Sequence, residues 1–258
     1  MLTATVAAVR HRRANVIAAF LKRVDEALRV AEVTLYPFLD LAIRLWLAQA
    51  FWVSGVLKLA NWDTALTLAT HEYPVSWLDP FTAAVLGVVT EVLGSTLLAF
   101  GLATRLAVIP LLILTLVIQF EYRALDQHLY WAALFGWYMV MGAGPISLDR
   151  LLASGLASSA LPLVGPLGRL YAALTRYLGP VYQLALRLWL ASLWFTPVLV
   201  GRSFLEAVLG FVSPLLALGL ATRLAAIGAA LALLGSGFMG VDEIQAIDRL
   251  YQLFLLGL

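Results

Sequence analysis

Cysteine is absent from the 258 residues of this chain, and charged residues make up only 12% of them. Without cysteine the chain cannot form disulfides, ligate an iron–sulfur cluster through thiolates or use a thiol nucleophile. The chain also lacks a P-loop, a dinucleotide-binding glycine motif, a nucleophile elbow and a zinc-protease helix. These absences exclude the common soluble enzyme classes, and any redox chemistry has to use a borrowed cofactor.

Hydrophobic residues, in contrast, make up 62% of the chain. A soluble domain has about 25% charged residues, and this composition leaves too much apolar surface for one. Apolar runs of roughly 20 residues, long enough to cross a bilayer, recur along the chain. They predict an all-α polytopic membrane protein with about eight crossings, at 39–60, 81–102, 104–121, 127–145, 180–200, 203–221, 223–240 and 242–258.

The remaining segments divide the chain into parts. Residues 14–35 mix apolar and charged positions, which predicts an amphipathic helix on the membrane surface. Glycine and proline between Pro145 and Gly179 predict a linker of turns and short helices. The expected domains are an arm at 1–36, a four-helix bundle at 37–150, a linker at 151–179 and a second, degenerate bundle at 180–258.

Basic residues are unevenly distributed about the predicted crossings. Thirteen of the seventeen lysines and arginines fall on the side of the N-terminus, among them those at 10–29. The positive-inside rule therefore places both termini in the cytoplasm of a bacterial-type inner membrane. Because the basic residues form no stripe interleaved with aromatic residues, they indicate topology and membrane lipid rather than nucleic acid.

An internal repeat relates the two predicted bundles. Gly101–Ala107 recurs without change as Gly219–Ala225, and Arg44–Ala48 recurs as Arg187–Ala191. A third, looser match relates the segment from Glu121 to Tyr130 to Glu243–Tyr251. Three matches in the same order predict a duplication, and four crossings per copy predict parallel copies.

The copies are unequal between their first and third crossings, where the second copy lacks the segment 61–80. This segment is rich in aromatic residues, including Trp62 and Trp77, and is expected on the non-cytoplasmic side. Its aromatic residues are typical of an interfacial belt. The alternative is a re-entrant lid over a cavity in the first bundle.

Glu91 lies in the middle of the second predicted crossing, where an ionised carboxylate needs a partner. Lys58, near the end of the first crossing, is expected to supply it because its long side chain can reach inward. The pair is either a structural ion pair or a proton-handling site. The repeat aligns Glu91 with Leu209 and Lys58 with Gly201. The second copy lacks both charges, which favours a site in the first bundle.

A second group of polar residues is expected at the outer end of the third and fourth crossings. It contains Glu121, Arg123, Asp126 and His128, and only His71 could join it from another loop. Carboxylates and imidazole can bind a divalent metal. The sequence has no tight His-x-His or His-x3-His spacing, so no metal site is predicted.

Several of these segments resemble the DoxX family, with its DoxD-like relatives, across about residues 39–152. The resemblance is carried by Arg44-Leu45-Trp46, Ser54–Leu59, Glu91–Gly94, Gly101–Arg105 and Gly142–Asp149. It implies a four-helix membrane bundle associated with redox systems, among them thiosulfate:quinone oxidoreduction. The second copy and the basic arm depart from a single-unit member of that family.

These observations lead to one hypothesis and two alternatives. The leading hypothesis is a membrane subunit that couples a partner oxidoreductase to the quinone pool. Lys58 and Glu91 would handle protons near the headgroup, and the residues expected to bind the quinone are Trp62, His71, Trp77, Arg105, Glu121 and His128. A non-catalytic scaffold that assembles partner proteins is the alternative. A transporter is disfavoured because the second bundle has few polar residues.

Overall fold

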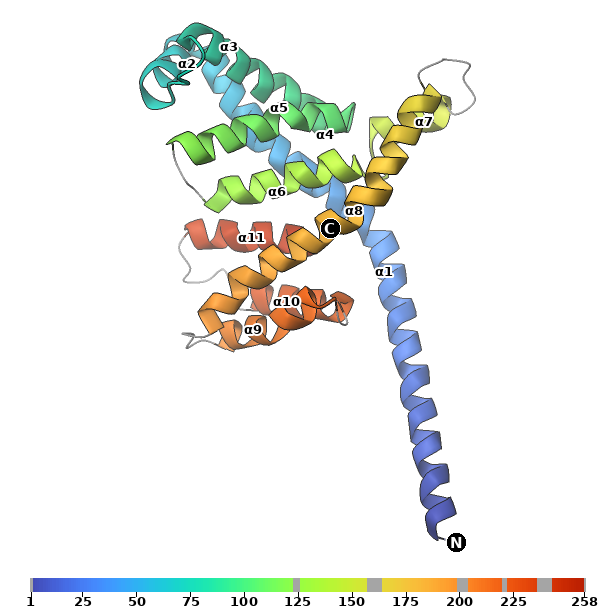
Figure 1. Ribbon diagram of the computed structural model, residues 1–258. Coiled ribbons are helices and arrows are strands. Elements are labelled where there is room, and N and C mark those ends of the chain that lie inside the picture. The colour runs from blue at the N-terminus through green and yellow to red at the C-terminus, as the bar shows by residue number, and fades with distance from the viewer. Residues whose placement is uncertain are drawn as a thin grey trace. The chain divides into compact units, whose positions relative to one another are not determined.

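The computed structural model describes residues 2–122, 126–156, 164–198, 204–219, 222–235 and 243–257. These residues contain helices and no strand, which confirms the predicted all-α class (Figure 1). The chain divides into two compact units, Met1–Phe38 and Leu39–Leu258. Each unit is described by itself, and the candidate site lies in the second.

Most of the described residues belong to helices. The α-helices are α1 Leu2–Ala60, α2 Trp62–Thr67, α3 Pro80–Val89, α4 Ser95–Phe100, α5 Thr104–Val117, α6 Asp126–Met141, α7 Leu148–Leu156, α8 Val164–Val198, α9 Phe204–Ala217, α10 Thr222–Gly235 and α11 Glu243–Gly257. Three π-helical segments lie among them, η1 Leu68–Glu72, η2 Thr90–Gly94 and η3 Ile118–Tyr122. Because η2 joins α3 directly to α4, the second predicted crossing is one helical rod.

The predicted arm and first crossing form one helix. Helix α1 runs through Pro37 without a break. A proline removes one backbone hydrogen bond and disfavours a helix interior, yet a long helix can retain its other bonds around it. Within Met1–Phe38, an exposed pair at 3.0 Å joins Arg29 Nε to Asp25 Oδ2. This pair spans one helical turn, as expected for helical neighbours.

Two segments expected to be irregular are also largely helical. Residues 61–80 contain α2 and η1, and the predicted linker contains α7 and the first half of α8. The expectation that Gly165, Pro166 and Gly168 break the linker into turns is wrong from Val164 onward. Proline is tolerated in the first turn of a helix, where its missing N–H has no partner to lose, and Pro166 lies there.

Among the described residues, two helical rods are long and apolar enough to cross a bilayer, Pro80–Phe100 and Thr104–Glu121. Other predicted crossings correspond to shorter helices, such as α6 with 16 residues and α9 with 14. A helix of 14–16 residues extends about 21–24 Å, less than the ~30 Å of a hydrocarbon core. Eight crossings therefore remain a prediction.

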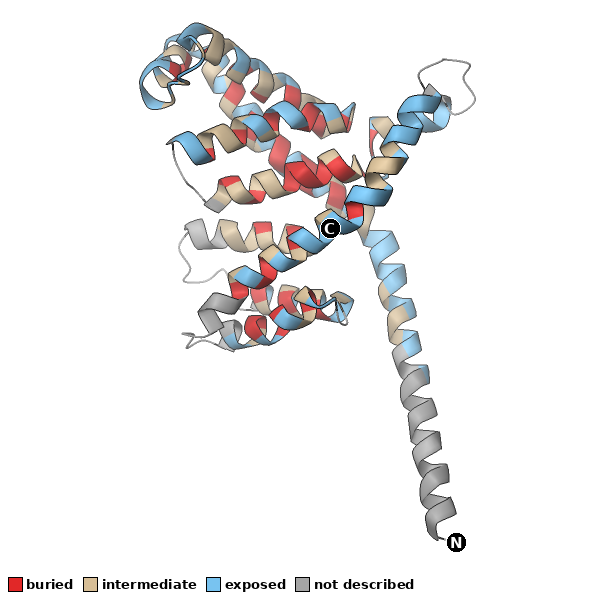
Figure 2. Ribbon diagram, viewed as in Figure 1, coloured by how far each residue is buried: buried red, intermediate tan, exposed pale blue. Residues whose placement is uncertain are grey.

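The core of the second unit is centred on α6. This helix packs against α5, α8 and α11, and α9 packs against both α8 and α10. Figure 2 shows buried residues concentrated along α6, where Leu134, Phe135 and Tyr138 have no exposed surface. A helix that is apolar on all sides belongs in the interior of a bundle.

A buried ion pair joins the ends of several helices in the first bundle. Arg44 Nε lies 3.0 Å from Asp40 Oδ2, and both side chains are completely buried. The guanidinium also donates to the carbonyl oxygens of Leu98, Ala99 and Ile146. Arg44 thus neutralises a carboxylate and satisfies carbonyls at the C-terminal end of α4, where a cation is favoured.

The carboxylate of Asp40 has further partners of its own. Its Oδ2 accepts from the backbone N–H of Gly144 at 3.1 Å, and the Tyr138 hydroxyl donates to the Asp40 carbonyl at 3.1 Å. Asp149 then accepts from the backbone N–H groups of Ala103 and Thr104 at 2.7 and 2.9 Å, which caps α5. We call these residues, with Arg44, Gly101 and Ser147, the Asp40–Arg44 cluster.

Gly101 is the turn between α4 and α5, and it lies inside this cluster. Its φ of +63° is left-handed, a conformation that favours glycine. A Cβ there would lie 2.5 Å from Arg44 Nη1 and 2.6 Å from Ser147 Cβ. The repeated residues show the same pairing more loosely, since Gly219 has φ +71° and its Cβ would lie 3.4 Å from Arg187 Nη1.

This difference predicts unequal effects of one substitution at the two glycines. Gly219→Ala should cost about 1 kcal/mol, the strain of a left-handed alanine. Gly101→Ala should cost about 2–4 kcal/mol because the methyl group also overlaps the buried arginine. Thermal unfolding followed by tryptophan fluorescence measures both changes. Equal losses of stability at the two positions would show that the Asp40–Arg44 cluster can accommodate the methyl group without cost.

Candidate functional site

The candidate site forms where α1 meets η2. Gly55 makes this contact possible, because a Cβ there would lie 2.8 Å from Glu91 Cβ and from Val92 Cγ2. Lys58 lies three residues after Gly55 and therefore on the same face of α1. The close approach of the helices brings the lysine within reach of Glu91.

The predicted pair is present. Lys58 Nζ lies 2.6 Å from Glu91 Oε1, with 5% of the glutamate side chain and 27% of the lysine side chain exposed. The second carboxylate oxygen, Oε2, is buried without a hydrogen-bond partner. A buried polar atom without a partner is costly, and Asp40 Oδ1 of the other buried pair is in the same state.

The backbone around Glu91 is also unusual. Thr90–Gly94 is π-helical, and the hydroxyl of Ser95 donates to the Glu91 carbonyl. Thr96 Oγ1 donates to the Val92 carbonyl at 2.6 Å. Single π-helical turns inside α-helices occur frequently at functional sites. The residue expected from the repeat at the position of Glu91 is Leu209, which is buried in α9.

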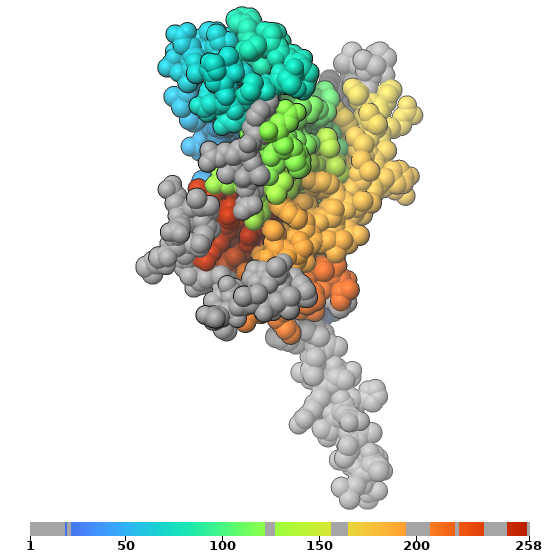
Figure 3. Space-filling view, turned by 60° about the vertical axis from the view of Figure 1, so that its left-hand side comes forward, coloured from blue at the N-terminus to red at the C-terminus, as the bar shows by residue number. Residues whose placement is uncertain are grey.

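The segment 61–80 packs on α3 beside this pair. Ala65 and Ala69 form a small buried cluster with α3 residues, and Trp62 and Val92 pack against it. Trp62 also meets Phe81 edge to face, with ring centroids 5.9 Å apart. Figure 3 shows this blue-green part of the chain gathered at one end of the first bundle.

An N-terminal cap holds α3 beneath this segment. Asp79 Oδ1 accepts from the backbone N–H of Thr82 at 3.0 Å. Hydrogen bonds from Thr82 stabilise the carboxylate form and lower the pKa of Asp79 below its ordinary 3.8. The cap is therefore complete above pH 3.8 and is lost as the pH falls through the lowered pKa.

The other residues expected at a quinone site are placed less closely. His71 lies in η1 and is exposed, and Trp77 lies before α3 with 66% of its surface exposed. Trp62 packs on the same small buried cluster as Val92, the residue that follows Glu91.

The expected outer cluster is partly described. His128 is buried, and its Nδ1 lies 3.2 Å from Gln119 Oε1, while Glu121 is exposed in η3. Arg123 and the side chain of Asp126 lie outside the described residues. Within the described part of the chain no three His, Asp or Glu side chains gather as metal ligands.

Arg105 has a different environment from the one expected of a quinone ligand. Its guanidinium donates to the carbonyls of Met139, Val140 and Met141 at the end of α6, and to Thr175 Oγ1 of α8 at 2.7 Å. These contacts satisfy the last carbonyls of α6. The structure does not bring Arg105 to the Lys58–Glu91 pair.

Sequence reasoning missed two groups of polar residues. Asp40 was expected only as part of a crossing, although its spacing from Arg44 is that of a helical ion pair. Tyr251 was noted only as a repeat match, yet its hydroxyl accepts from the indole N–H of Trp131 at 2.5 Å and of Trp46 at 3.4 Å. The signal for Tyr251 was the repeat, which aligns it with Tyr130.

Comparison with known proteins agrees with the resemblance seen in the sequence. Residues 39–123 match the family model described as DoxX. This match includes α1 from Leu39, the segment 61–80, the α3–η2–α4 rod and α5, so it contains both Lys58 and Glu91. No curated protein and no solved structure matches the chain.

The pair allows a test of how its two charges depend on each other. Lys58→Met should destabilise by about 3 kcal/mol, because it leaves Glu91 buried without its cation. Glu91→Leu should cost less, since Lys58 is partly exposed and its ammonium can reach solvent. The double variant Lys58→Met/Glu91→Leu has leucine at the position that the repeat aligns with Leu209. Its unfolding temperature should be closer to wild type than that of Lys58→Met. Additive losses in thermal unfolding would contradict coupling of the two charges.

Proposed function

We propose that this chain, whose residues 39–123 match the DoxX family model, is a membrane protein that couples a partner oxidoreductase to the quinone pool. The pair Lys58–Glu91 is the proton-handling site of this proposal. The observation that carries it is the buried, unpartnered Glu91 Oε2 beside a cation at 2.6 Å from Oε1.

The chemistry of the pair suits a quinone headgroup. The lysine ammonium can donate a hydrogen bond to a quinone carbonyl and favour negative charge there. The glutamate can give up or accept the proton that accompanies reduction or oxidation of the headgroup. Ionisable residues within membrane segments frequently mark proton paths, which supports this assignment.

The surroundings of the pair fit a hydrophobic ligand. Lys58 keeps 27% of its side chain exposed, so the pair is open on the lysine side. Leu57 and Leu59 beside it are exposed by 64% and 59%, an apolar surface that an isoprenoid chain could contact. In the proposed topology this surface faces lipid on the non-cytoplasmic side of an inner membrane, with α2 and η1 as the cover.

A scaffold that assembles partner proteins is the second candidate, and the arm supports it. Val30, Val33 and Leu35 of Met1–Phe38 are exposed by 67%, 76% and 62%. Apolar residues this exposed on a helix suit contact with a partner or with lipid headgroups. The scaffold places function in residues 1–35 and predicts that Glu91 is dispensable.

Substitutions at the pair separate these candidates. Glu91→Gln should abolish quinone-linked turnover in membranes and lower, by at least tenfold, the quinone extracted with the purified protein. Gly55→Ala should lower both the turnover and the bound quinone by displacing α1 from η2. Gly87→Ala is its control and should change neither, because nothing lies within 4 Å of a Cβ at that position. Glu26→Gln, which removes an exposed carboxylate of the arm, is the control for charge.

Deletion of residues 1–35 provides the opposite test. The quinone proposal predicts that this deletion leaves bound quinone unchanged, while the scaffold predicts loss of the co-purifying proteins identified by mass spectrometry. Unchanged turnover and unchanged quinone content in folded Glu91→Gln would overturn the quinone proposal. Loss of partners on deletion, with Glu91→Gln active, would establish the scaffold.

A further inference from the structure

The two halves meet along helices α1, α6, α8 and α11, and their contacts occur in matched pairs. We call the residues of this contact the seam: Trp46 and Phe51 of α1, Tyr130 and Trp131 of α6, Trp189 and Trp194 of α8, and Tyr251 and Gln252 of α11. The repeat aligns these residues between halves, with Trp46 matched to Trp189 and Tyr130 matched to Tyr251.

The first matched contact joins a tryptophan of one half to a tyrosine of the other. Trp46 Nε1 donates to the Tyr251 hydroxyl at 3.4 Å. With the halves exchanged, Trp189 lies against Tyr130, with ring centroids 5.3 Å apart. Each half thus presents its first-helix tryptophan to the last-helix tyrosine of the other.

The second matched contact involves the residue after each tyrosine. Trp131 Nε1 donates to the Tyr251 hydroxyl at 2.5 Å. In the exchanged position, Gln252 Nε2 donates to the Tyr130 hydroxyl at 3.0 Å. An indole N–H in one half and an amide N–H in the other therefore make the same hydrogen bond across the seam.

A third pair of contacts supports these donors within each half. Phe51 packs edge to face on Trp131, with centroids 5.0 Å apart. Trp194, at the position of Phe51 in the repeat, donates to Gln252 Oε1 at 3.1 Å. Phe51–Trp131 and Trp194–Gln252 are therefore two versions of one supporting pair.

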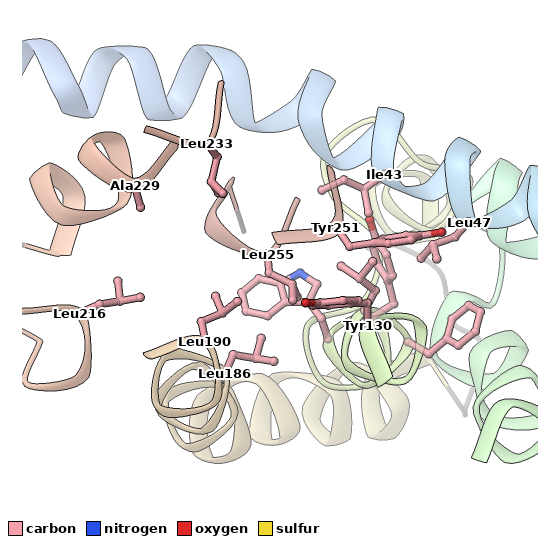
Figure 4. Packing of buried hydrophobic residues seen from close by; sticks show 14 of the residues in the cluster. Ile43, Leu47, Tyr130, Leu186, Leu190, Leu216, Ala229, Leu233, Tyr251 and Leu255 are labelled. Carbon is pink, nitrogen blue, oxygen red and sulfur yellow. The ribbon is translucent and has the colours of Figure 1, made fainter. Parts of the chain in front are cut away.

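One contact lies between equivalent residues. Tyr130 and Tyr251 stack with centroids 5.7 Å apart and planes inclined by 12°. Figure 4 shows the two rings nearly parallel, with Ile43 and Leu47 of α1 near one ring. Their repeat partners Leu186 and Leu190 of α8 are buried in the same cluster.

Contacts that recur with the partners exchanged are the mark of a twofold interface, in which the same patch is used by both sides. We infer that the halves of this chain pair about a pseudo-twofold axis through the Tyr130–Tyr251 stack. The seam of the first half is thus a surface that fits a second four-helix unit of its own kind, and the chain supplies that unit itself.

The substituted positions of the seam explain why the two halves stay distinct. The first half has phenylalanine and tryptophan where the second has tryptophan and glutamine. Both versions deliver one N–H donor to the opposing tyrosine, so each keeps a hydrogen bond within an apolar interior, where an unpartnered group is costly. The equivalence concerns the seam alone, since the Lys58–Glu91 pair has no counterpart in α9.

Transplanting one supporting pair into the other half tests the symmetry. In the second half the Trp194 indole donates to the Gln252 amide. Trp131→Gln alone introduces an amide at 131 without such an indole at position 51. Phe51→Trp alone crowds Trp131. Each single change should lower the unfolding midpoint by about 5 °C. The double variant Phe51→Trp/Trp131→Gln should recover to within about 2 °C of wild type, because it reproduces the pair of the second half.

A matched control introduces tryptophan at a phenylalanine that also contacts Phe51 but has no equivalent tryptophan in the second half. Phe135 also packs on Phe51, at 5.2 Å, yet the repeat does not align it with Trp194. Phe135→Trp/Trp131→Gln should therefore show no recovery. A transplanted double variant whose loss equals the sum of the single losses would overturn the pseudo-twofold, as would a double variant that fails to fold while both single variants fold. Recovery in the double variant alone supports it.

Discussion

The completely buried ion pair between Asp40 and Arg44 is the constraint on which the first bundle depends. Two charges without exposed surface are tolerated only when each has partners, because desolvation of an isolated charge is very unfavourable. Arg44 finds carbonyls at the end of α4 and in the connection before α7, and Asp40 finds the N–H of Gly144. The pair therefore ties the end of α4 to the connection that follows α6.

This arrangement leaves the other end of α1 free to carry chemistry. Lys58 follows Arg44 by 14 residues, which is about 21 Å along the helix. At Arg44 the cation binds Asp40 of its own helix and the carbonyls of Leu98, Ala99 and Ile146, while Asp40 Oδ1 is buried without a hydrogen-bond partner. At Lys58 the carboxylate partner also has an oxygen without a hydrogen bond, and this pair differs in that the lysine side chain is 27% exposed. One helix thus holds a structural pair and a candidate functional pair.

The sequence was sufficient to predict the second of these pairs and insufficient for the first. Glu91 stands alone in an apolar run, so a partner was required, and Lys58 was the cation within reach. Asp40 and Arg44 lie at the end of a predicted crossing, where an arginine also indicates topology, and their burial depends on residues 98–101 and 144–149 folding over them. The continuity of α8 was equally hidden, because glycine and proline near Val164 indicate turns unless tertiary packing favours a helix.

In the proposed pseudo-twofold arrangement, the repeat keeps an interface, whereas the second half lacks the charges of the candidate site. Phe51 and Trp131 of the first half correspond to Trp194 and Gln252 of the second, and a change of one residue alone would leave a donor or a cavity in an apolar interior. Lys58 and Glu91 pair with each other within the first half, and Leu209 packs in the core where a carboxylate would need a cation. Replacing a buried ion pair by apolar residues is often neutral for stability, whereas losing one charge is not. A half that keeps both charges avoids the cost of losing one of them, and the proposed ligand at Glu91 Oε2 would add a second reason to keep the pair.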